Sequence, residues 1–245
     1  VLEQAAISIR ELLSKAVAKH KLTNEQALAI IDRIHFSNTL QEVKADLCIE
    51  AIIEKPAPKI ELFNQLAAQN DDNCILASNT SSLSITILAQ SIPFPKRVAG
   101  LHFFNPATLM KLVEVVKGNQ TSNEVTDALT NFIRKTGKTP VTCIDSPGFI
   151  VNRVARPYYI EALRLVEEGL ATIEQVDAVM EQAGFKLGPF KLMDLIGNDI
   201  NYAVSESVYE QMNKPERLKP SFIQKEKVDK KELGRKTGKG YYDYE

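Results

Sequence analysis

Short apolar runs and amphipathic stretches alternate along the first 145 residues. Residues 1–21 carry apolar side chains at helical spacing, and Thr23 predicts the N-cap of a second helix, with Gln26 at the reciprocal capping position. Further helices are predicted over 59–69 and 123–136. Strands are predicted at 45–53, 74–77, 98–104, 112–116 and 139–144. Strands that alternate with helices predict a mostly parallel, doubly wound sheet, and therefore an α/β fold.

The pattern changes at the segment Asp145-Ser146-Pro147-Gly148, after which there is almost no strand signal. Helices are predicted over 149–168, 172–184 and 189–212. The tail, residues 233–244, is rich in Gly, Lys and Tyr and is predicted to wrap around the surface. We therefore predict two domains, an α/β domain over residues 1–145 and an all-helical domain over residues 146–245.

Composition excludes several classes of protein. Apolar residues make up 44% and charged residues 25%, as in soluble globular proteins. The net charge of -1 gives no overall basic field for nucleic acid or a membrane surface. No apolar run reaches the length of about 20 residues that a membrane span needs.

The cysteines and histidines favour neither disulfides nor a metal site. Cys48, Cys74 and Cys143 are widely spaced within apolar runs, which predicts buried thiols in a reducing, cytoplasmic compartment. Three His and three Cys without short ligand spacings predict that no metal is bound.

The candidate chemistry lies where apolar runs end in polar residues, because open α/β sheets bind ligands at the carboxyl ends of their strands. His102 is flanked by apolar residues, and Glu114 lies twelve residues further on in the next strand-like run. A turn between the two strands could bring this carboxylate to one ring nitrogen and so prepare the other as a general base. From spacing alone, a buried histidine bonded to a backbone carbonyl, with Glu114 in solvent, is the interpretation to be favoured, since buried polar groups are usually just satisfied.

Five motifs in fixed order carry a family resemblance. They are Ala77-Ser78-Asn79-Thr80-Ser81-Ser82-Leu83, Gly100-Leu101-His102-Phe103-Phe104-Asn105-Pro106, Lys111-Leu112-Val113-Glu114-Val115-Val116, Asp145-Ser146-Pro147-Gly148-Phe149-Ile150-Val151-Asn152-Arg153, and the tail from Leu233 to Tyr242. Together they resemble the L-3-hydroxyacyl-CoA dehydrogenase family along the whole chain. The resemblance implies NAD as the cofactor, a 3-hydroxyacyl-CoA substrate, and a homodimer formed through the helical domain.

The same resemblance assigns roles to individual residues. His102 matches the general base and Glu114 the acid that orients it. Ser81 matches the serine that hydrogen-bonds the 3-oxygen of the substrate, and Asn152 matches the asparagine that helps to position the acyl group and the histidine. Since each of the last two could equally cap a helix or bond to backbone, their roles depend on the resemblance.

Contacts with the cofactor and with coenzyme A are implied in the same way. Residues that match the nicotinamide side of the cofactor site are Ala51, Glu54, Lys59, Asn79 and Asn105. The family's coenzyme A side corresponds to Lys19 and Lys21, with Lys15 nearby. The alternatives are an ordinary surface pair for Glu54 and Lys59, and a solvated basic face for the lysines.

One expected feature of a dinucleotide-binding fold is missing. Such a domain opens with a strand, a Gly-rich turn and a helix, but the first glycine here is Gly100. We therefore expect a truncated Rossmann-like domain that lacks its first strand–turn–helix–strand unit, and no activity for the chain without that unit. Two other functions stay open, another hydroxyacid dehydrogenase with a lysine base and a non-catalytic, crystallin-like structural relative.

Overall fold

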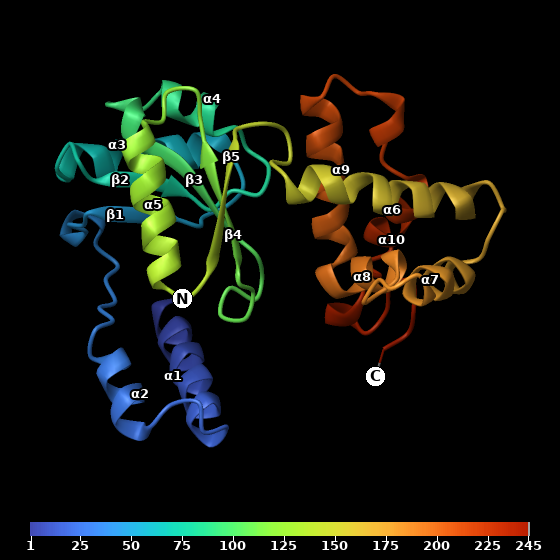
Figure 1. Cartoon of the computed structure of the whole chain (residues 1–245), viewed down its shortest axis with the longest axis horizontal. Coiled ribbons are helices and arrows are strands. Elements are labelled where there is room, and N and C mark those ends of the chain that lie inside the picture. The colour runs from blue at the N-terminus through green and yellow to red at the C-terminus, as the bar shows by residue number, and fades with distance from the viewer. Residues whose placement is uncertain (245) are drawn as a thin grey trace.

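The computed structural model describes residues 1–244 and gathers five strands into one sheet (Figure 1). The strands are β1 (Leu47–Glu50), β2 (Ile75–Ser78), β3 (Val98–Phe103), β4 (Leu112–Lys117) and β5 (Thr139–Ile144), and their order in the sheet follows the sequence. Neighbouring strands are parallel except for β3 and β4, which are antiparallel. The prediction of a mostly parallel sheet is confirmed. A loop without a crossover helix joins β3 to β4, as an antiparallel pair allows.

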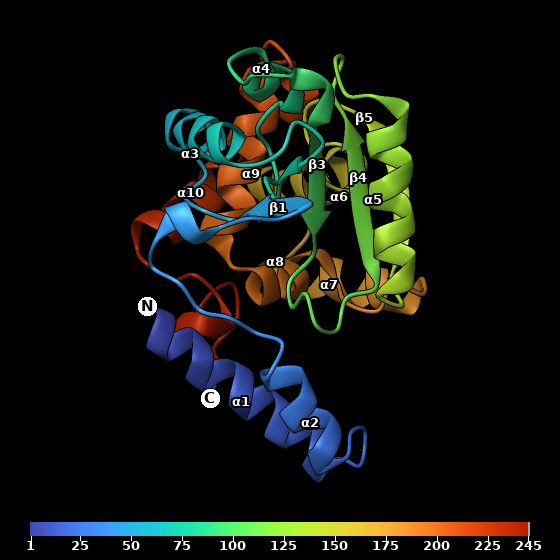
Figure 2. The same cartoon turned by 90° about the vertical axis from the view of Figure 1, so that its left-hand side faces the viewer.

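Helices cover both faces of this sheet (Figure 2). Helices α3 (Pro56–Gln69) and α4 (Ile85–Gln90) lie on one face, and α5 (Asn123–Lys135) lies on the other. Neighbouring residues along a strand point to opposite faces, so Leu76 packs with Phe63 of α3 while Ala77 packs with Leu129 of α5. The sheet is therefore the middle layer of three.

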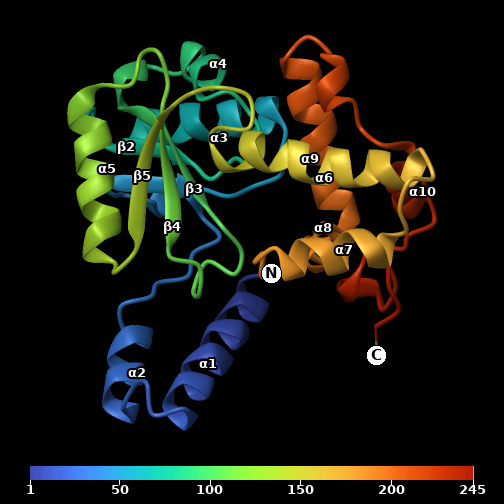
Figure 3. The same cartoon turned by 45° about the vertical axis from the view of Figure 1, so that its right-hand side comes forward.

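Helices α1 (Leu2–Ala18) and α2 (Asn24–Ile31) form a hairpin that stands away from the sheet (Figures 1 and 3). The capping box predicted at the start of α2 is confirmed, because Thr23 Oγ1 accepts from Gln26 N at 3.2 Å and Gln26 Oε1 accepts from Thr23 N at 2.9 Å. Neither helix has a buried residue. The chain returns to β1 through a 3-10 turn at Leu40–Glu42.

The residues after β5 form a layer of helices beside the sheet (Figure 3). They are α6 (Val151–Glu167), α7 (Ile173–Gln182), α8 (Pro189–Ile196), α9 (Asn198–Gln211) and α10 (Phe222–Asp229), with 3-10 turns at Glu216–Leu218 and Arg235–Thr237 and another at Pro95–Arg97 in the α/β part. Across residues 1–244, no helix combines the length and the apolar character that crossing a lipid bilayer requires.

The region predicted as one helix over 189–212 forms two helices, α8 and α9. The prediction of a single helix over 189–212 is wrong, because Gly197 adopts φ +104°, a backbone conformation outside the helical region that separates α8 from α9. Helix α10 was not predicted as a separate element.

The prediction that the tail wraps around the surface holds only in part, because residues 235–239 are exposed but the residues after them are packed against α8. Tyr241 is buried, and its backbone N–H donates to Asp194 Oδ1 of α8 at 3.0 Å, while the N–H of Tyr242 donates to Oδ2 at 3.0 Å. The tail approaches so closely that a Cβ atom on Gly240 would lie 2.0 Å from Asp194 Oδ1. The end of the tail is therefore packed into the helical core, while residues 235–239 stay on the surface.

Replacing Asp194 by alanine should destabilise the protein by about 3 kcal/mol or more, because each buried N–H left without an acceptor costs about 1–3 kcal/mol. Denaturant unfolding of both proteins measures the difference. The control is Asp199→Ala, which removes a partly exposed ion pair with Lys236 and should cost at most about 1 kcal/mol. Equal losses in the two variants would contradict this account of the tail.

Candidate active site

His102 and Glu114 are directly opposite each other in the antiparallel pair of β3 and β4. Opposite residues of such a pair project on the same face of the sheet, and the carboxylate Oε2 lies 2.7 Å from His102 Nδ1. The two residues are only 4% and 1% exposed. The carboxylate at Nδ1 assigns the ring proton to that nitrogen and leaves Nε2 with a free lone pair.

Two aromatic rings keep water from the imidazole. The ring of Phe104 lies 4.5 Å from it, centroid to centroid, and the ring of Phe149 lies 5.8 Å away. Gly148 and Phe149 both have positive φ, +74° and +51°, and this tight turn leads the chain from β5 into α6. The apolar surroundings predicted for His102 are thus provided by the flanking Phe104 and by Phe149, which is distant in the sequence.

The second oxygen of Glu114 accepts hydrogen bonds at the start of α6. Ile150 N donates to Oε1 at 3.0 Å and Val151 N at 2.9 Å. Burial alone would raise the pKa of Glu114, but the hydrogen bonds from His102, Val151 and Ile150 outweigh it and hold the pKa below its ordinary value of 4.5. The acid that faces the imidazole is therefore ionised and has a fixed orientation.

The loop after β2 (residues 79–84, called the Ser81 loop) and helix α6 bring two further predicted residues to the histidine. Ser81 Oγ lies 3.1 Å from His102 Nε2, and Asn152 Nδ2 donates to the carbonyl of Ser81 at 3.2 Å. The structure thus gathers all four predicted catalytic residues, which come from β3, β4, the Ser81 loop and α6. The two more open positions are Ser81 and Asn152.

The conformation of the Ser81 loop depends on Glu54. Its Oε1 accepts from the backbone N–H groups of Ser81 at 2.9 Å and Ser82 at 3.2 Å, and from the hydroxyl of Thr80. A carboxylate that gathers several donors at a turn fixes the direction of the chain there. Glu54 therefore holds the serine in reach of the imidazole.

Lys59 lies beneath this loop in a buried ion pair. Its Nζ is 2.8 Å from Glu50 Oε2 and 3.4 Å from Glu54 Oε2, and both Lys59 and Glu50 have side chains only 1% exposed. Glu50 also accepts from the hydroxyl of Ser78. The alternative of an ordinary surface pair is wrong for Lys59. Glu50 was not predicted, although a lone carboxylate inside the apolar run that forms β1 was a usable signal.

The remaining predicted residues lie at different distances from this cluster. Asn79 Oδ1 accepts from Phe103 N at 2.9 Å, so it joins β2 to β3 beside His102. Ala51 and Asn105 are exposed on the segments that follow β1 and β3. Lys19 and Lys21 lie in the turn between α1 and α2, at the end of the hairpin that points away from the sheet (Figure 3).

The residues present fit part of a nicotinamide nucleotide site. Glu54 is 41% exposed and has one oxygen that the loop does not use, and the amide nitrogen of Asn79 has no hydrogen bond within residues 1–244. A hydroxyl of a ribose and a carboxamide are the groups that such an acceptor and donor would bind. Lys59 does not fit a direct contact, because it is buried behind Glu50 and Glu54.

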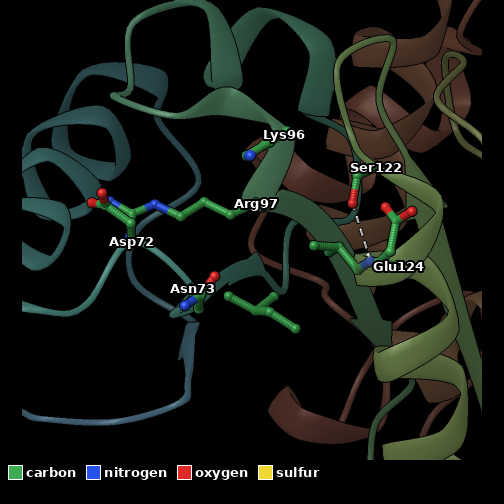
Figure 4. Close-up of a pocket in the computed structure, with 8 residues that line it drawn as sticks. Asp72, Asn73, Lys96, Arg97, Ser122 and Glu124 are labelled. Carbon is green, nitrogen blue, oxygen red and sulfur yellow. Dashed lines mark hydrogen bonds between the residues drawn. The ribbon is translucent and has the colours of Figure 1, made fainter.

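A hollow of about 380 Å³ lies at the opposite edge of the sheet, where β2 and β3 begin (Figure 4). Its lining mixes charges of both signs, Asp72 and Glu124 with Lys96 and Arg97. The hollow is remote from His102 and belongs to no part of the candidate site. Within the described residues 1–244, no three His, Cys, Asp or Glu side chains are grouped so as to hold a metal ion.

The fold and the site together define an α/β dehydrogenase domain joined to a helical domain. The family model described as "3-hydroxyacyl-CoA dehydrogenase, NAD binding domain" matches residues 1–146, and the model of the C-terminal domain of the same enzymes matches residues 148–244. The chain belongs to the 3-hydroxyacyl-CoA dehydrogenase family.

Individual relatives agree with this assignment. A 3-hydroxyadipyl-CoA dehydrogenase of Escherichia coli is 46% identical over 99% of the chain, and the mitochondrial hydroxyacyl-coenzyme A dehydrogenase of Sus scrofa is 42% identical over 97%. The chain spans 52% of the first relative's length and 77% of the second's. The crystal structure of the (S)-3-hydroxybutyryl-CoA dehydrogenase of Ralstonia eutropha matches this chain with a TM-score of 0.95 at 36% identity. The match covers 100% of this chain and 87% of the chain in that crystal structure.

Replacing Lys59 by methionine should destabilise the protein by about 3–5 kcal/mol, because it leaves Glu50 as a buried carboxylate without its cation. Chemical denaturation measures the loss. The double variant Glu50→Gln/Lys59→Met removes both charges and should recover most of the stability. A double variant no more stable than Lys59→Met would contradict a role that depends on charge.

Glu114 should make stability depend on pH. Its folded-state pKa is lowered, so its stabilising contribution is present above about 4.5 and is lost as the pH falls through the lowered value. The difference in unfolding free energy between the wild type and Glu114→Gln should therefore be largest near neutral pH and shrink in acid. The exposed Glu216→Gln serves as control, and a constant difference for Glu114→Gln would refute the prediction.

Proposed function

We propose that the protein is an NAD-dependent dehydrogenase that interconverts (3S)-3-hydroxyacyl-CoA and 3-oxoacyl-CoA, with His102 as the general base. One observation carries the proposal. The imidazole is bonded through Nδ1 to a buried, ionised carboxylate, and it presents Nε2 towards a serine hydroxyl at the carboxyl edge of the sheet. Membership of the family supports the same reaction.

His102 takes the proton of the 3-hydroxyl group. Because Nδ1–H is held by Glu114, Nε2 is the nitrogen with a free lone pair, and the carboxylate stabilises the imidazolium that forms. When bound, NAD would supply the acceptor for the hydride that leaves C3. Hydride leaves more readily as the hydroxyl becomes an alkoxide, so a base at this oxygen lowers the barrier of the redox step.

Ser81 and Asn152 act on the substrate. Ser81 Oγ lies 3.1 Å from Nε2, so a substrate oxygen beside the imidazole would also receive the serine hydroxyl as a donor. Donors placed where negative charge develops stabilise the transition state more than the ground state. Asn152, held against the Ser81 carbonyl, orients the acyl group on the helical side.

The cofactor would be held by residues at the ends of β1 and β2. Glu54 and Asn79 would bind the nicotinamide side of NAD, while Ala51 and Asn105 form its exposed margin. Lys59 would act through Glu54 rather than touch the cofactor. Lys19 and Lys21 are proposed to meet the phosphates of coenzyme A, since the turn between α1 and α2 offers cations free of ion pairs within residues 1–244.

Two domains and a homodimer complete the proposal. A division near residue 145 is supported by the change from strands to helices and by the two family models, which meet there. A dimer through the helical domain is supported by large apolar side chains exposed on it, among them Val154, Leu170, Val179 and Phe222. Free thiols at Cys48, Cys74 and Cys143 fit a reducing, cytoplasmic compartment.

Other functions find less support. A dehydrogenase with a lysine base would need a free amine at the site, whereas Lys59 is buried and paired with Glu50. A crystallin-like structural relative would not need an oriented imidazole. The names of relatives differ in the acyl group, because one Escherichia coli protein is named for 3-hydroxyadipyl-CoA and an Escherichia coli crystal structure for 3-hydroxybutyryl-CoA. This proposal therefore leaves the acyl chain open.

Substituting glutamine for His102 should lower kcat for acetoacetyl-CoA reduction by about 10²–10⁴-fold, the usual contribution of a general base. The rate is measured with the full-length protein from the loss of NADH absorbance as NADH is oxidised to NAD. His35→Gln changes an exposed histidine of the same type and should leave kcat unchanged. Equal activity in His102→Gln and wild type would exclude the proposed mechanism, and no turnover by the wild type would favour the structural relative.

A further inference from the structure

The Ser81 loop is bonded to a carboxylate near each of its ends. Glu54 accepts from Ser81 N at 2.9 Å, beside the imidazole. Where the loop passes into α4, Asp145 Oδ2 accepts from the hydroxyl of Ser84 at 2.7 Å and from Thr86 N at 2.8 Å. The path of the loop is therefore fixed by two acids, and Asp145 holds the end that leads away from the reaction centre.

The backbone of Asp145 is itself held by the sheet. The residue follows β5 directly, and its N–H donates to the Lys117 carbonyl at the end of β4 at 2.9 Å. Just beyond β4, Asn119 N donates to Thr86 Oγ1 at 3.1 Å, so the start of α4 is attached to the same end of these two strands. The carboxylate therefore acts on the loop from a fixed position.

The two oxygens of Asp145 differ sharply in their contacts. Oδ2 receives both donors, and hydrogen bonds to a carboxylate are roughly twice as strong as those between neutral groups. Oδ1 is buried and has no hydrogen-bond partner within residues 1–244. A buried oxygen without a donor costs free energy that a smaller, neutral side chain would not. This cost indicates that the carboxylate has a specific task, which is the contact with Ser84 and Thr86.

The segment that begins at Asp145 returns to the reaction centre. It leads from β5 into the helical domain (Figures 1 and 3), where Asn152 Nδ2 donates to the Ser81 carbonyl at 3.2 Å. The segment and the Ser81 loop are thus joined at two places, by Asn152 beside the histidine and by Asp145 at Ser84. With only one of these contacts, the loop could pivot about the other.

We propose, on the basis of the function proposed above, that Asp145 is a positioning residue for Ser81, keeping the serine hydroxyl where it can meet the substrate oxygen beside His102. Asp145 acts through Ser84 and the loop, without a hydrogen bond to the imidazole. Loss of its carboxylate releases the loop at α4, so that the hydroxyl samples a wider range of positions. A displacement of about 1 Å can cost about 10²-fold in rate, even when its cause lies outside the reacting groups.

The first test replaces Asp145 by alanine and by asparagine in the full-length protein. Asp145→Ala should lower kcat for acetoacetyl-CoA reduction by about 10–100-fold and leave KM for NADH within about 2-fold. Asp145→Asn keeps one oxygen that can accept from both donors, so its kcat should stay within about 3-fold of wild type. Asp127→Ala, on the exposed face of α5, should change nothing. An asparagine variant as impaired as the alanine variant contradicts a role for the acceptor.

Ser84→Ala breaks the same contact from the other side, and it keeps the test decisive if Asp145→Ala does not fold. It should lower kcat by about 3–10-fold, since the bond from Thr86 remains. Ser122→Ala removes the equivalent N-cap of α5, where Ser122 Oγ accepts from Val125 N at 3.3 Å, and should leave kcat unchanged. Equal kcat values for Ser84→Ala and Ser122→Ala would overturn the proposal.

A double variant shows whether the effect passes through the serine. In Ser81→Ala there is no hydroxyl left to position, so adding Asp145→Ala should lower kcat by no more than about 2-fold further. A merely structural Asp145 would instead lower kcat by the same factor with and without the serine. Equal factors in the two backgrounds overturn the proposal, as does an unchanged kcat in Asp145→Ala.

Hydrogen exchange separates this proposal from the dehydrogenase function. If the wild type turns over no 3-oxoacyl-CoA, that function has failed, and exchange of the backbone amides decides the role of Asp145 without any substrate. The amides of Ser81 and Ser82 should exchange about 10-fold or more faster in Asp145→Ala than in wild type, while those of α5 keep their rates. Equal rates at Ser81 and Ser82 in the two proteins would refute the proposal, even for an active enzyme.

Discussion

The carboxylate of Glu114 is the interaction on which the site depends. One of its oxygens holds His102 Nδ1, and the other accepts the first N–H groups of α6. The partial positive charge at a helix start favours the ionised acid, and the ionised acid in turn fixes the tautomer of the imidazole. A single side chain therefore connects the α/β part, the helical part and the imidazole of His102, so that errors in packing at α6 are transmitted to the imidazole.

The sequence predicted this pair because the pair is local. His102 and Glu114 belong to consecutive strands, and the antiparallel register places them opposite each other, which leaves the solvated alternative for Glu114 without support. Ser81 and Asn152 are 71 residues apart at their hydrogen bond, and no spacing rule connects them. They were identified through the motifs of the family, and the structure brings them to one point while their roles remain proposals.

What could not be predicted depends on contacts between distant segments. Arg156 lies on an amphipathic helix, where an arginine is normally interpreted as solvent-facing, and only the packing of α9 buries it. The tail contains polar and glycine residues typical of a surface segment, yet Asp194 binds its backbone from 47 residues away. Gly197 ends α8 although the apolar periodicity continues across it, since periodicity reports on burial and not on backbone conformation.

Glu54 divides its two oxygens between two tasks. One oxygen accepts from the N–H groups of the Ser81 loop, and the other lies 3.4 Å from Lys59 Nζ, in a side chain that is 41% exposed. A nucleotide that donates a hydrogen bond to the second oxygen of Glu54 would reduce the negative charge on the first. Nucleotide binding would therefore change the free energy of the hydrogen bonds that hold the Ser81 loop. Thermodynamic linkage makes such an effect reciprocal: an acyl substrate that orders the serine would strengthen nucleotide binding by the same factor by which the nucleotide strengthens binding of the acyl substrate.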